Sequence, residues 1–498
     1  MLAGGVAPEK TLGERAIILM MGRIGAVVVG LATPMVLVRV FSQSEFGAYR
    51  QIQLALMTVL GILMLGFPQS LYYFFPKYPA RRRTFVSQGF YSQVIFGCIF
   101  LGFTLFAGKI LTNFFKHDIF LTASPLIGVI ALFQLTRSYL ESLMIVEKRV
   151  AWASLYIVGH DVLRGIALVV VVLIIPTLMA IIITLLIYEG MLFLFALTYT
   201  GIRYGLFRFP VAKDAVAEQS KYAFPLGFAG GIAAVIQRLD QFIIVTRYSP
   251  ADFAIYSQGA FPMRFFNIPQ QSIFDLVIPK VVTMIRDGQR EELIRFWYDL
   301  VFKMAIITMP VVVLSQVVGT DAMVLLFTEQ YKSSGYLFQV YVLMLLRFIP
   351  AYPVLPRAYG RTGIIMKSNM VALVVMVGLG WIGTIYLGMY GMVGALIISQ
   401  YVMGYIQLQS GRRDLGLPRG QLLPWKRLTG VTLVAILSAV LPILVSLVLR
   451  NLMIRVTACI LLYLICYVLL LYLMKVFDWV HDPAIRKVLH RYLPFVPA

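Results

Sequence analysis

The stretch FSQSEFGAYRQ occupies Phe41–Gln51, and a related stretch, YSPADFAIYSQ, occupies Tyr248–Gln258. A serine, an acidic residue, a phenylalanine, a tyrosine and a glutamine match at one constant offset. Each copy separates two long apolar runs, and an even number of such runs lies between the copies, so we expect both on the same side of a membrane. The repeat predicts two six-helix lobes that are related by an axis along the membrane normal.

The composition also predicts a membrane-embedded chain. The 498 residues are 60% hydrophobic and 13% charged, with a mean hydropathy of +0.86, whereas soluble domains are about 45–50% apolar and about 25% charged. Apolar runs of roughly 20–25 residues can cross a ~30 Å hydrocarbon core as helices, and the ~10-residue alternating segments of a spanning barrel are absent. The sequence therefore excludes a soluble, disordered or disulfide-stapled protein and predicts an all-α polytopic membrane protein.

We predict about 14 transmembrane helices, six in each lobe and two that follow. Their approximate ranges are 16–39, 50–75, 86–107, 119–145, 151–175, 178–202, 222–246, 254–279, 299–318, 334–356, 367–388, 390–410, 428–449 and 452–474. The lobes are then 1–207 and 208–411, and 412–498 holds two extra helices and a tail. Prolines interrupt several of these helices and indicate either static kinks or gating positions: Pro34, Pro68, Pro225, Pro262, Pro269, Pro279, Pro350, Pro353 and Pro356.

The basic residues predict the orientation. The net charge is +21, and one set of loops with both tails carries about 28 Lys and Arg residues against about seven on the other side, so the basic side is expected in the cytoplasm. Charges scattered in this way do not indicate a nucleic-acid partner. Met1–Arg15 has no cleavage site for a signal peptide. In the tail, Asp482 and Pro483 predict the start of a basic amphipathic helix, either on the inner membrane surface or in solution.

Ionisable residues inside the predicted spans are candidate substrate contacts, because a charge near the bilayer centre costs about 2.5–3.5 kcal/mol. Arg264, Asn267, Gln271 and Asp275 recur every three or four residues and so form one stripe on the eighth helix. Arg264 lies about ten residues into that helix, or roughly 15 Å. The stripe predicts a hydrated central cavity, and a polar seam between helices is the alternative.

Other spans carry charges with an open interpretation. Arg137 and Glu141 could pair on the fourth helix, as could Asp161 and Arg164, next to His160, on the fifth, and each set is either a local ion pair or a substrate site. Glu189 has no obvious local partner. On the seventh helix Asp240 shares a face with Gln237 and Gln241, while Arg238 points elsewhere. Arg23 lies about seven residues inside the first helix, and a side chain that reaches the inner headgroups is the alternative to a substrate contact there. Arg50 begins the second helix, and its side chain is expected to reach the outer headgroups.

These charges predict the kind of substrate. Guanidinium groups bind phosphate in bidentate fashion, whereas an exporter of cationic drugs would favour carboxylates and aromatic rings. We therefore expect an anionic substrate, with these binding residues: Arg23, Arg264, Asn267, Gln271, Arg137 and Arg238. Asp240 and Glu189 are the candidates for coupling transport to an ion.

Signatures of catalysis are missing. The chain has no GxxxxGK[ST] loop, no histidine spacing suited to a metal and no arrangement for nucleophilic catalysis. Cys98, Cys459 and Cys466 all lie in apolar runs. We predict no catalytic residue, no metal and no cofactor. Gly227, Gly230 and Gly231 are expected to serve helix packing.

Taken together, these features resemble the polysaccharide-export branch of the multidrug/oligosaccharidyl-lipid/polysaccharide exporter superfamily, the O-antigen-type flippases. The resemblance is carried by Gly13-Glu14-Arg15, by RVFSQSEFGAY at Arg39–Tyr49, by the second copy at Arg247–Tyr256 and by the layout of six, six and two helices. It implies alternating-access flipping of a polyprenyl-diphosphate-linked oligosaccharide, an O-antigen or exopolysaccharide repeat unit, across a bacterial cytoplasmic membrane. In relatives, cavity arginines engage the diphosphate or acidic sugars. Arg23 and Arg264 fall where related lipid II flippases keep such arginines, and Arg50 is an approximate match.

The resemblance leaves alternatives open. One is a multidrug or lipid II exporter with the same fold, against which the arginines argue. Another is a membrane-embedded glycan polymerase or transferase, against which the short outer loops argue. As partners the resemblance implies the lipid-linked glycan and membrane lipids, with a polysaccharide polymerase and glycosyltransferases as further candidates.

Overall fold

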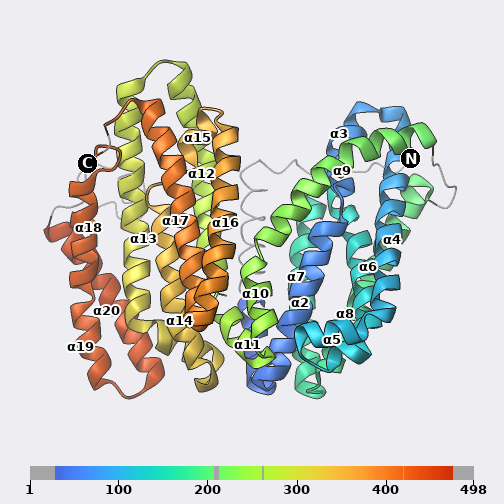
Figure 1. Cartoon of the computed structure of the whole chain (residues 1–498), viewed down its shortest axis with the longest axis horizontal. Coiled ribbons are helices and arrows are strands. Elements are labelled where there is room, and N and C mark those ends of the chain that lie inside the picture. Colours follow the sequence, from blue (N-terminus) through green and yellow to red (C-terminus); the bar gives the residue numbers. More distant parts are fainter. Residues whose placement is uncertain (1–28, 207–211, 261–262, 419, 475–498) are drawn as a thin grey trace, which may run out of the picture. The chain divides into compact units, whose positions relative to one another are not determined.

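The computed structural model describes residues 29–206, 212–260, 263–418 and 420–474. These residues are almost entirely helical, and no strand occurs among them (Figure 1). The predicted all-α fold is therefore confirmed. The chain divides into two compact units, Met1–Ser257 and Gln258–Ala498.

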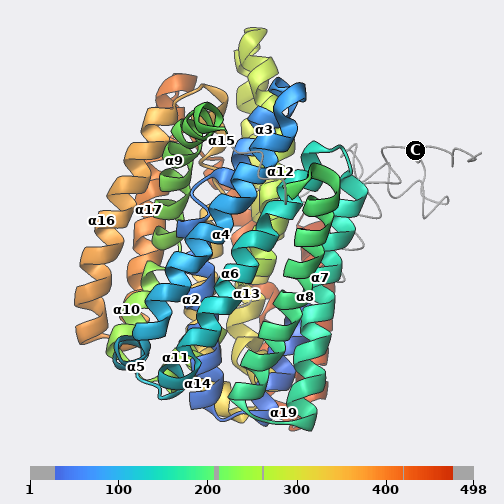
Figure 2. The same cartoon turned by 90° about the vertical axis from the view of Figure 1, so that its right-hand side faces the viewer.

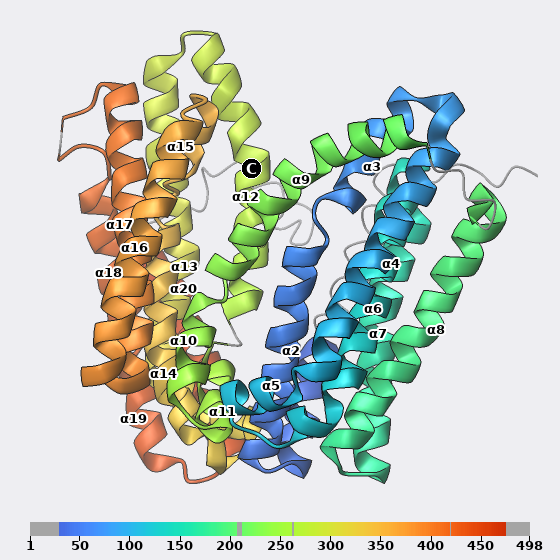
Figure 3. The ribbon, with the colours of Figure 1, turned by 45° about the vertical axis from the view of Figure 1, so that its right-hand side comes forward.

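The first unit is a bundle of long helices. After a helical segment at Val29–Val40, its elements are α2 (Gln43–Leu63), α3 (Phe67–Lys77), η1 (Pro79–Arg81), α4 (Arg82–Phe106), α5 (Gly108–Phe115), α6 (Ile119–Val146), α7 (Val150–Ile174), α8 (Leu178–Tyr204), α9 (Lys213–Ile236), α10 (Leu239–Arg247) and most of α11 (Pro250–Gly259). The helix α6 lies between α4 and α8 (Figure 2). The helix α9 packs obliquely against α2 and α3 (Figure 3).

The second unit is organised around the longest helix, α13. Its elements are α12 (Met263–Arg286), α13 (Arg290–Phe327), η3 (Glu329–Tyr331), α14 (Lys332–Val342), η4 (Leu343–Phe348), α15 (Val354–Ala358), α16 (Thr362–Tyr386), α17 (Gly388–Leu415), α18 (Trp425–Ser438), α19 (Val440–Val448) and α20 (Leu452–Leu473). The helices α16 and α17 pair with each other, and α18 and α20 pack on α13. Tyr463 and Tyr467 of α20 are buried in that contact, where the Tyr467 hydroxyl donates to the Ile306 carbonyl at 2.9 Å.

The two repeat copies have the same local structure. Ser42 precedes α2, its hydroxyl accepts from the Glu45 amide at 3.3 Å, and the Glu45 carboxylate accepts from the Ser42 amide at 3.0 Å. Ser249 and Asp252 form the matching pair at the start of α11, with both distances 3.2 Å. These capping boxes explain why a serine and an acidic residue recur three positions apart, because each satisfies an N–H group that the helix leaves unpaired.

The repeat copies also contact each other inside the first unit. A Cβ atom placed on Gly47 would lie 1.8 Å from the Pro250 carbonyl oxygen, so only glycine permits this approach. The Arg50 Nε donates to the Ser257 hydroxyl at 3.4 Å, and Arg50 is only 9% exposed. The prediction that Arg50 reaches the headgroups is therefore wrong, because α2 begins at Gln43 and places this arginine within the packing.

Ten helices of the described residues are long and apolar enough to cross a membrane, and the number is eleven if the bent pair α9–α10 is counted as one span. The count of about 14 is not confirmed. The predicted spans outside the ten are the first, of which Val29–Val40 is described, the seventh, the eighth and the tenth. The first of these is described only from Val29 onward, and the seventh and tenth are divided into shorter helices. The eighth is represented by α12, which carries polar and charged residues along its length.

Breaks in the first unit are built into its packing. Leu65 and Gly66 have φ of 42° and 75° between α2 and α3, and Pro68 lies in the first turn of α3. The Met64 carbonyl accepts from the Gln93 side-chain amide of α4 and from the Phe67 amide, both at 3.1 Å, as expected where a helix breaks at membrane depth. A Cβ atom on Gly227 would lie 2.0 Å from the Leu65 carbonyl carbon, so this glycine serves packing as predicted.

A second break divides the seventh predicted span. The helix α9 ends at Ile236, and α10 leaves it at an angle of 49°. The prediction of one continuous helix over 222–246 is wrong at this point. The division of the chain after Ser257 follows from the packing of α9 on α2 and α3, and the lobe boundaries at 207 and 411 stay predictions.

Candidate functional site

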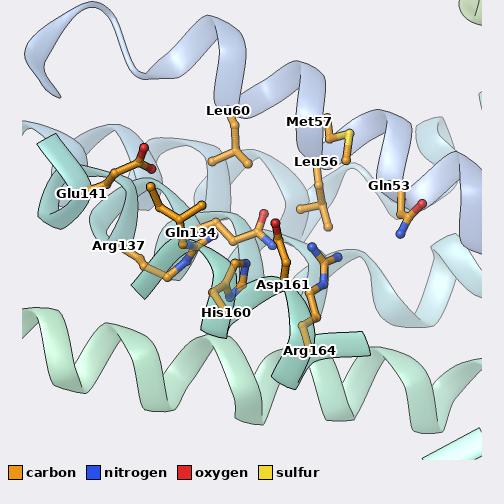
Figure 4. A pocket seen from close by; sticks show the side chains of 11 residues that line it. Gln53, Leu56, Met57, Leu60, Gln134, Arg137, Glu141, His160, Asp161 and Arg164 are labelled. Carbon is orange, nitrogen blue, oxygen red and sulfur yellow. The ribbon is translucent and has the colours of Figure 1, made fainter. Parts of the chain in front are cut away.

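A cavity of about 280 Å³ lies within the first unit, between α2, α6 and α7 (Figure 4). We refer to it as the lobe cavity. One wall is the apolar side of α2, and the polar side chains of α6 and α7 project toward it (Figure 4). Its lining consists of Gln53, Leu56, Met57, Leu60, Gln134, Arg137, Glu141, Ile157, His160, Asp161 and Arg164.

An ion pair joins α6 and α8 next to the lobe cavity. The Arg137 Nε of α6 lies 2.9 Å from the Glu189 Oε2 of α8. The Gln134 side-chain amide donates to the other oxygen, Oε1, at 2.8 Å. The Glu189 side chain is fully buried, and that of Arg137 is 16% exposed. A fully buried carboxylate is thus held by one guanidinium and one amide, which offsets the cost of taking it out of water.

This ion pair corrects two interpretations of the sequence. Arg137 pairs with Glu189 on the neighbouring helix and not with Glu141 on its own. Glu189, which has no obvious local partner in the sequence, is the better paired of the carboxylates in this cluster. Helical spacing brings Gln134 and Arg137 to one face of α6, but it contains no information on which face of α8 meets them.

His160 is fixed by its neighbour Tyr188. The Tyr188 hydroxyl donates to the His160 carbonyl at 3.0 Å and lies 3.3 Å from the ring atom Nδ1. The two rings stack with centroids 5.5 Å apart. Both residues are buried, so this contact sets the orientation of α7 against α8 at the level of the ion pair. Tyr188 is not among the site residues predicted from the sequence, where only its position next to Glu189 indicates it.

Three charged side chains of the lobe cavity can still bind a ligand. Arg164, Asp161 and Glu141 make no hydrogen bond or ion pair with any other residue that the structure describes. Asp161 is exposed and Arg164 half-buried. The local ion pair that the sequence allows between Asp161 and Arg164 is therefore not formed within 4.0 Å, although the two side chains are neighbours on α7 (Figure 4). The cavity thus offers a cationic fork and two carboxylates to a ligand.

Gln53 connects the cavity to the first repeat copy. Its amide donates to the Tyr49 hydroxyl at 2.6 Å, and its carbonyl oxygen accepts from the Arg50 Nη1 at 2.9 Å. These residues lie three and four positions apart on α2 and so share a face. Gln53 is not among the site residues predicted from the sequence.

Asp240 and Arg238 lie at the bend between α9 and α10. Asp240 is 7% exposed, and its Oδ2 accepts from the Tyr256 hydroxyl of α11 at 2.9 Å. Arg238 is half-buried and donates through Nη1 to the Ala234 carbonyl, at 2.9 Å. Neither residue lines the lobe cavity, so the structure does not bring them together with Arg137.

Several predicted site residues lie outside the described part of the chain. Arg23 and the tail helix expected from Asp482 fall in ranges that the structure does not describe. The backbone of Arg264, Asn267 and Gln271 belongs to α12, and their side chains, with that of Asp275, are among those not described. The helix expected over 254–279 is represented by two segments, α11 and α12, on either side of Phe261 and Pro262.

Comparison with known proteins places this fold in a family. The family model described as "Polysaccharide biosynthesis protein" matches residues 36–335, more than half of the chain, and includes both repeat copies and the lobe cavity. The chain belongs to this polysaccharide biosynthesis protein family. The resemblance to the polysaccharide-export branch of the superfamily is thereby confirmed. No curated protein sequence matches the chain significantly.

Solved structures with the same fold are transporters. The lipid II flippase MurJ, in an inward closed conformation, matches with a TM-score of 0.70 and 13% identity over 92% of this chain and 98% of its own. An inward-facing multidrug resistance MATE family transporter of the MOP superfamily matches with a TM-score of 0.64 and 12% identity, over 82% and 98%. A MOP superfamily transporter from Pyrococcus furiosus matches with 0.54 and 12%, over 80% and 94%. At these identities the comparisons show the fold alone.

Proposed function

We propose that this polysaccharide biosynthesis protein is a flippase that moves a polyprenyl-diphosphate-linked oligosaccharide from the inner to the outer leaflet of a bacterial cytoplasmic membrane. An O-antigen or exopolysaccharide repeat unit is the proposed cargo, and alternating access of the two lobes is the proposed mechanism. The observation that carries the proposal is the lobe cavity, in which Arg164 and two carboxylates lack protein partners among the described residues, in a chain of this family.

The chemistry of the cavity suits a charged glycan. A guanidinium donates to phosphate or carboxylate oxygens through a planar fork, and stays charged in the membrane. Sugar hydroxyls can donate to Asp161 and Glu141 and can accept from Arg164 or Gln53. A ligand without hydrogen-bonding groups would leave these side chains unpaired, at a cost of about 1–3 kcal/mol for each group and more for a charge.

The arginines of the proposal have different roles. Arg137 is held by Glu189, and we assign it to positioning the polar face of α6, with Arg164 as the contact for the substrate. Arg23, Arg264, Asn267, Gln271 and Arg238 remain proposed contacts for the diphosphate along its path. The two termini are proposed to be cytoplasmic, and a polysaccharide polymerase and glycosyltransferases are proposed partners.

Ion coupling is proposed for Asp240 in preference to Glu189. Asp240 is buried and accepts a hydrogen bond from the Tyr256 hydroxyl, and a buried carboxylate inside a membrane protein is a candidate proton carrier. Protonation of Glu189 would break its ion pair with Arg137 and leave that guanidinium without a counter-charge. Asp240→Asn should reduce gradient-dependent transport in reconstituted vesicles while Glu189→Gln mainly reduces stability. Full gradient dependence in Asp240→Asn would remove it from the mechanism.

The decisive experiment uses a strain without the gene and follows the lipid-linked sugars of both leaflets. Complementation with the natural chain should restore surface glycan, and Arg164→Gln should leave the lipid-linked glycan on the inner leaflet at equal expression. Arg164→Lys should restore part of the export, because the charge is retained and the fork is lost. Arg295→Gln, which removes a charge from an 83% exposed side chain, is the matched control.

The second candidate function is export of lipid II, which the TM-score of 0.70 to the lipid II flippase MurJ favours. Complementation of a strain depleted of its own lipid II flippase separates the two. Growth of that strain, with no change in the surface glycan of the deletion strain, would replace the first proposal by the second.

A further inference from the structure

A second pocket in the first unit is lined by basic residues, and we refer to it as the basic pocket. It has a volume of about 650 Å³ and lies at the ends of α3, α4, α6 and α8. Arg82, Arg83, Lys148 and Arg203 contribute four cations, and Glu147 is the only carboxylate in the lining. The apolar part of the lining includes Phe75 and Tyr204.

The single carboxylate, that of Glu147, is already paired with protein groups. The Glu147 side chain is 3% exposed, and it accepts hydrogen bonds from the hydroxyls of Tyr199 and Tyr204. The Arg203 Nε lies 2.9 Å from its Oε1. Glu147 therefore neutralises Arg203 and orders the end of α8 against α6. The other three cations of the pocket keep their positive charge for a ligand.

Arg82 is held in place by uncharged groups. Its Nε donates to the Phe75 carbonyl at 2.9 Å, and its guanidinium carbon lies 4.5 Å from the centre of the Phe75 ring. Arg82 also begins α4, and no side chain caps the N-terminus of this helix. The remaining N–H groups of the guanidinium can donate to an anion from a fixed position, next to a helix end that carries a partial positive charge.

Arg83 and Lys148 are the cations without a partner. Their charged groups make no hydrogen bond or ion pair with another described residue, and both side chains are exposed. Lys148 lies just past α6 with φ of 62°. The Lys148 amide donates to the Ile145 carbonyl at 2.9 Å and the Arg149 amide to the Met144 carbonyl at 3.0 Å, which is the Schellman pattern. Glycine is favoured at this left-handed position. The turn geometry therefore does not explain why a lysine occupies it.

The surroundings indicate where the ligand comes from. Ile202, the residue before Arg203, is 83% exposed, and further apolar side chains continue along one side of α8: Ile187, Met191, Leu194 and Phe195. These four are between 48% and 58% exposed. A face of this kind contacts lipid chains in a membrane-spanning helix, so the basic pocket lies at the end of a surface that lipid tails would cover.

We propose that the basic pocket binds the phosphate headgroup of an anionic membrane phospholipid, with the lipid chains along the apolar face of α8. Basic pockets between transmembrane helices recognise such headgroups through charge. The proposal goes beyond the flippase substrate and does not depend on it, since the pocket is distinct from the lobe cavity. It assigns a structural or regulatory lipid to one end of the first unit.

The test titrates purified protein in a neutral detergent with phosphatidylglycerol and counts bound lipids by native mass spectrometry. Phosphatidylcholine with the same chains and glycerol 3-phosphate are the comparison probes. The first phosphatidylglycerol should bind more tightly than the first phosphatidylcholine. The double variant Arg83→Gln with Lys148→Gly should weaken it about 30-fold, which corresponds to two basic residues near a headgroup.

Two controls separate binding from folding and from total charge. Lys148→Gly relieves the left-handed backbone, so its melting temperature should not fall, and a loss of binding cannot come from unfolding. Arg413→Gln with Lys426→Gln removes the same charge from exposed side chains outside the pocket and should leave binding unchanged. Equal losses in both double variants, equal affinity for the two lipids, or glycerol 3-phosphate binding as tightly as phosphatidylglycerol would overturn the proposal.

Discussion

The ion pair between Arg137 and Glu189 allows a quantitative test of how the first lobe is held together. Glu189 is fully buried and Arg137 is 16% exposed, with 2.9 Å between Nε and Oε2. Glu189→Gln leaves a buried guanidinium without its carboxylate, and Arg137→Gln leaves a buried carboxylate with one amide donor, Gln134. Breaking a buried pair from either side costs about 3–5 kcal/mol. We expect each single variant to lose that much free energy of unfolding.

The double variant gives the contrasting result. With Arg137→Gln and Glu189→Gln together, two amides replace two charges and can hydrogen-bond with each other and with Gln134. The loss should then be much smaller than the sum of the single losses, because replacing both members of a buried pair is close to neutral. The assay is equilibrium unfolding in detergent, analysed as a double-mutant cycle.

The control cycle uses Arg295 and Glu291 on α13. Their side chains are 83% and 90% exposed and 3.8 Å apart, so their coupling should be close to zero. Additive losses for Arg137 and Glu189 would refute the interpretation that each compensates the other. The stable double variant also isolates function: if it exports glycan normally, Arg137 serves positioning, and if it is folded but inactive, Arg137 contacts the substrate directly.

Three further predictions concern other parts of the chain. Arg264→Ala should leave the protein folded and inserted but stop export, with partial rescue by Arg264→Lys, measured as surface glycan at matched expression; full glycan with the alanine variant would leave the stripe on α12 as a packing seam. Gly47→Ala should lower the melting temperature by several degrees, since its Cβ would lie 1.8 Å from the Pro250 carbonyl oxygen, and an unchanged melting temperature would contradict the close packing of the repeat copies. A cysteine at Arg413 should react only with a membrane-permeant reagent and one at Ser44 also with an impermeant reagent, and the reverse pattern would invert the proposed orientation.

Much of the fold follows from the sequence because it depends on local patterns. The repeated serine and acidic residue form capping boxes at both places where they recur. Pro68 lies at a helix break, as predicted. Capping and backbone breaks need only neighbours in sequence, so one chain is enough to predict them. The number of membrane spans is harder, because a bent or interrupted helix no longer has the single apolar run on which the count rests.

The partners of the buried charges could not be predicted in the same way. Helical spacing shows that Arg137 and Glu141 share a face of one helix, yet Arg137 reaches across to Glu189, fifty-two positions further along the chain. Which side of α8 meets α6 depends on how the bulky side chains of both helices interlock. The wrong prediction for Arg50 has the same origin, since its guanidinium contacts Ser257 of the second repeat copy, far along the chain.

The distribution of partners within the polar cluster argues for the site of substrate contact. Glu189, the most deeply buried charge, has two partners, while the more accessible Arg164, Asp161 and Glu141 have none among the described residues. If the cluster served only to join α6, α7 and α8, the side chains nearest the cavity would also be expected to pair, since an unpaired charge in a membrane protein must otherwise keep its water. A ligand that enters the lobe cavity has to replace that water with hydrogen bonds of its own. An apolar drug cannot do so, whereas a glycan with hydroxyl and anionic groups can satisfy the guanidinium and both carboxylates together.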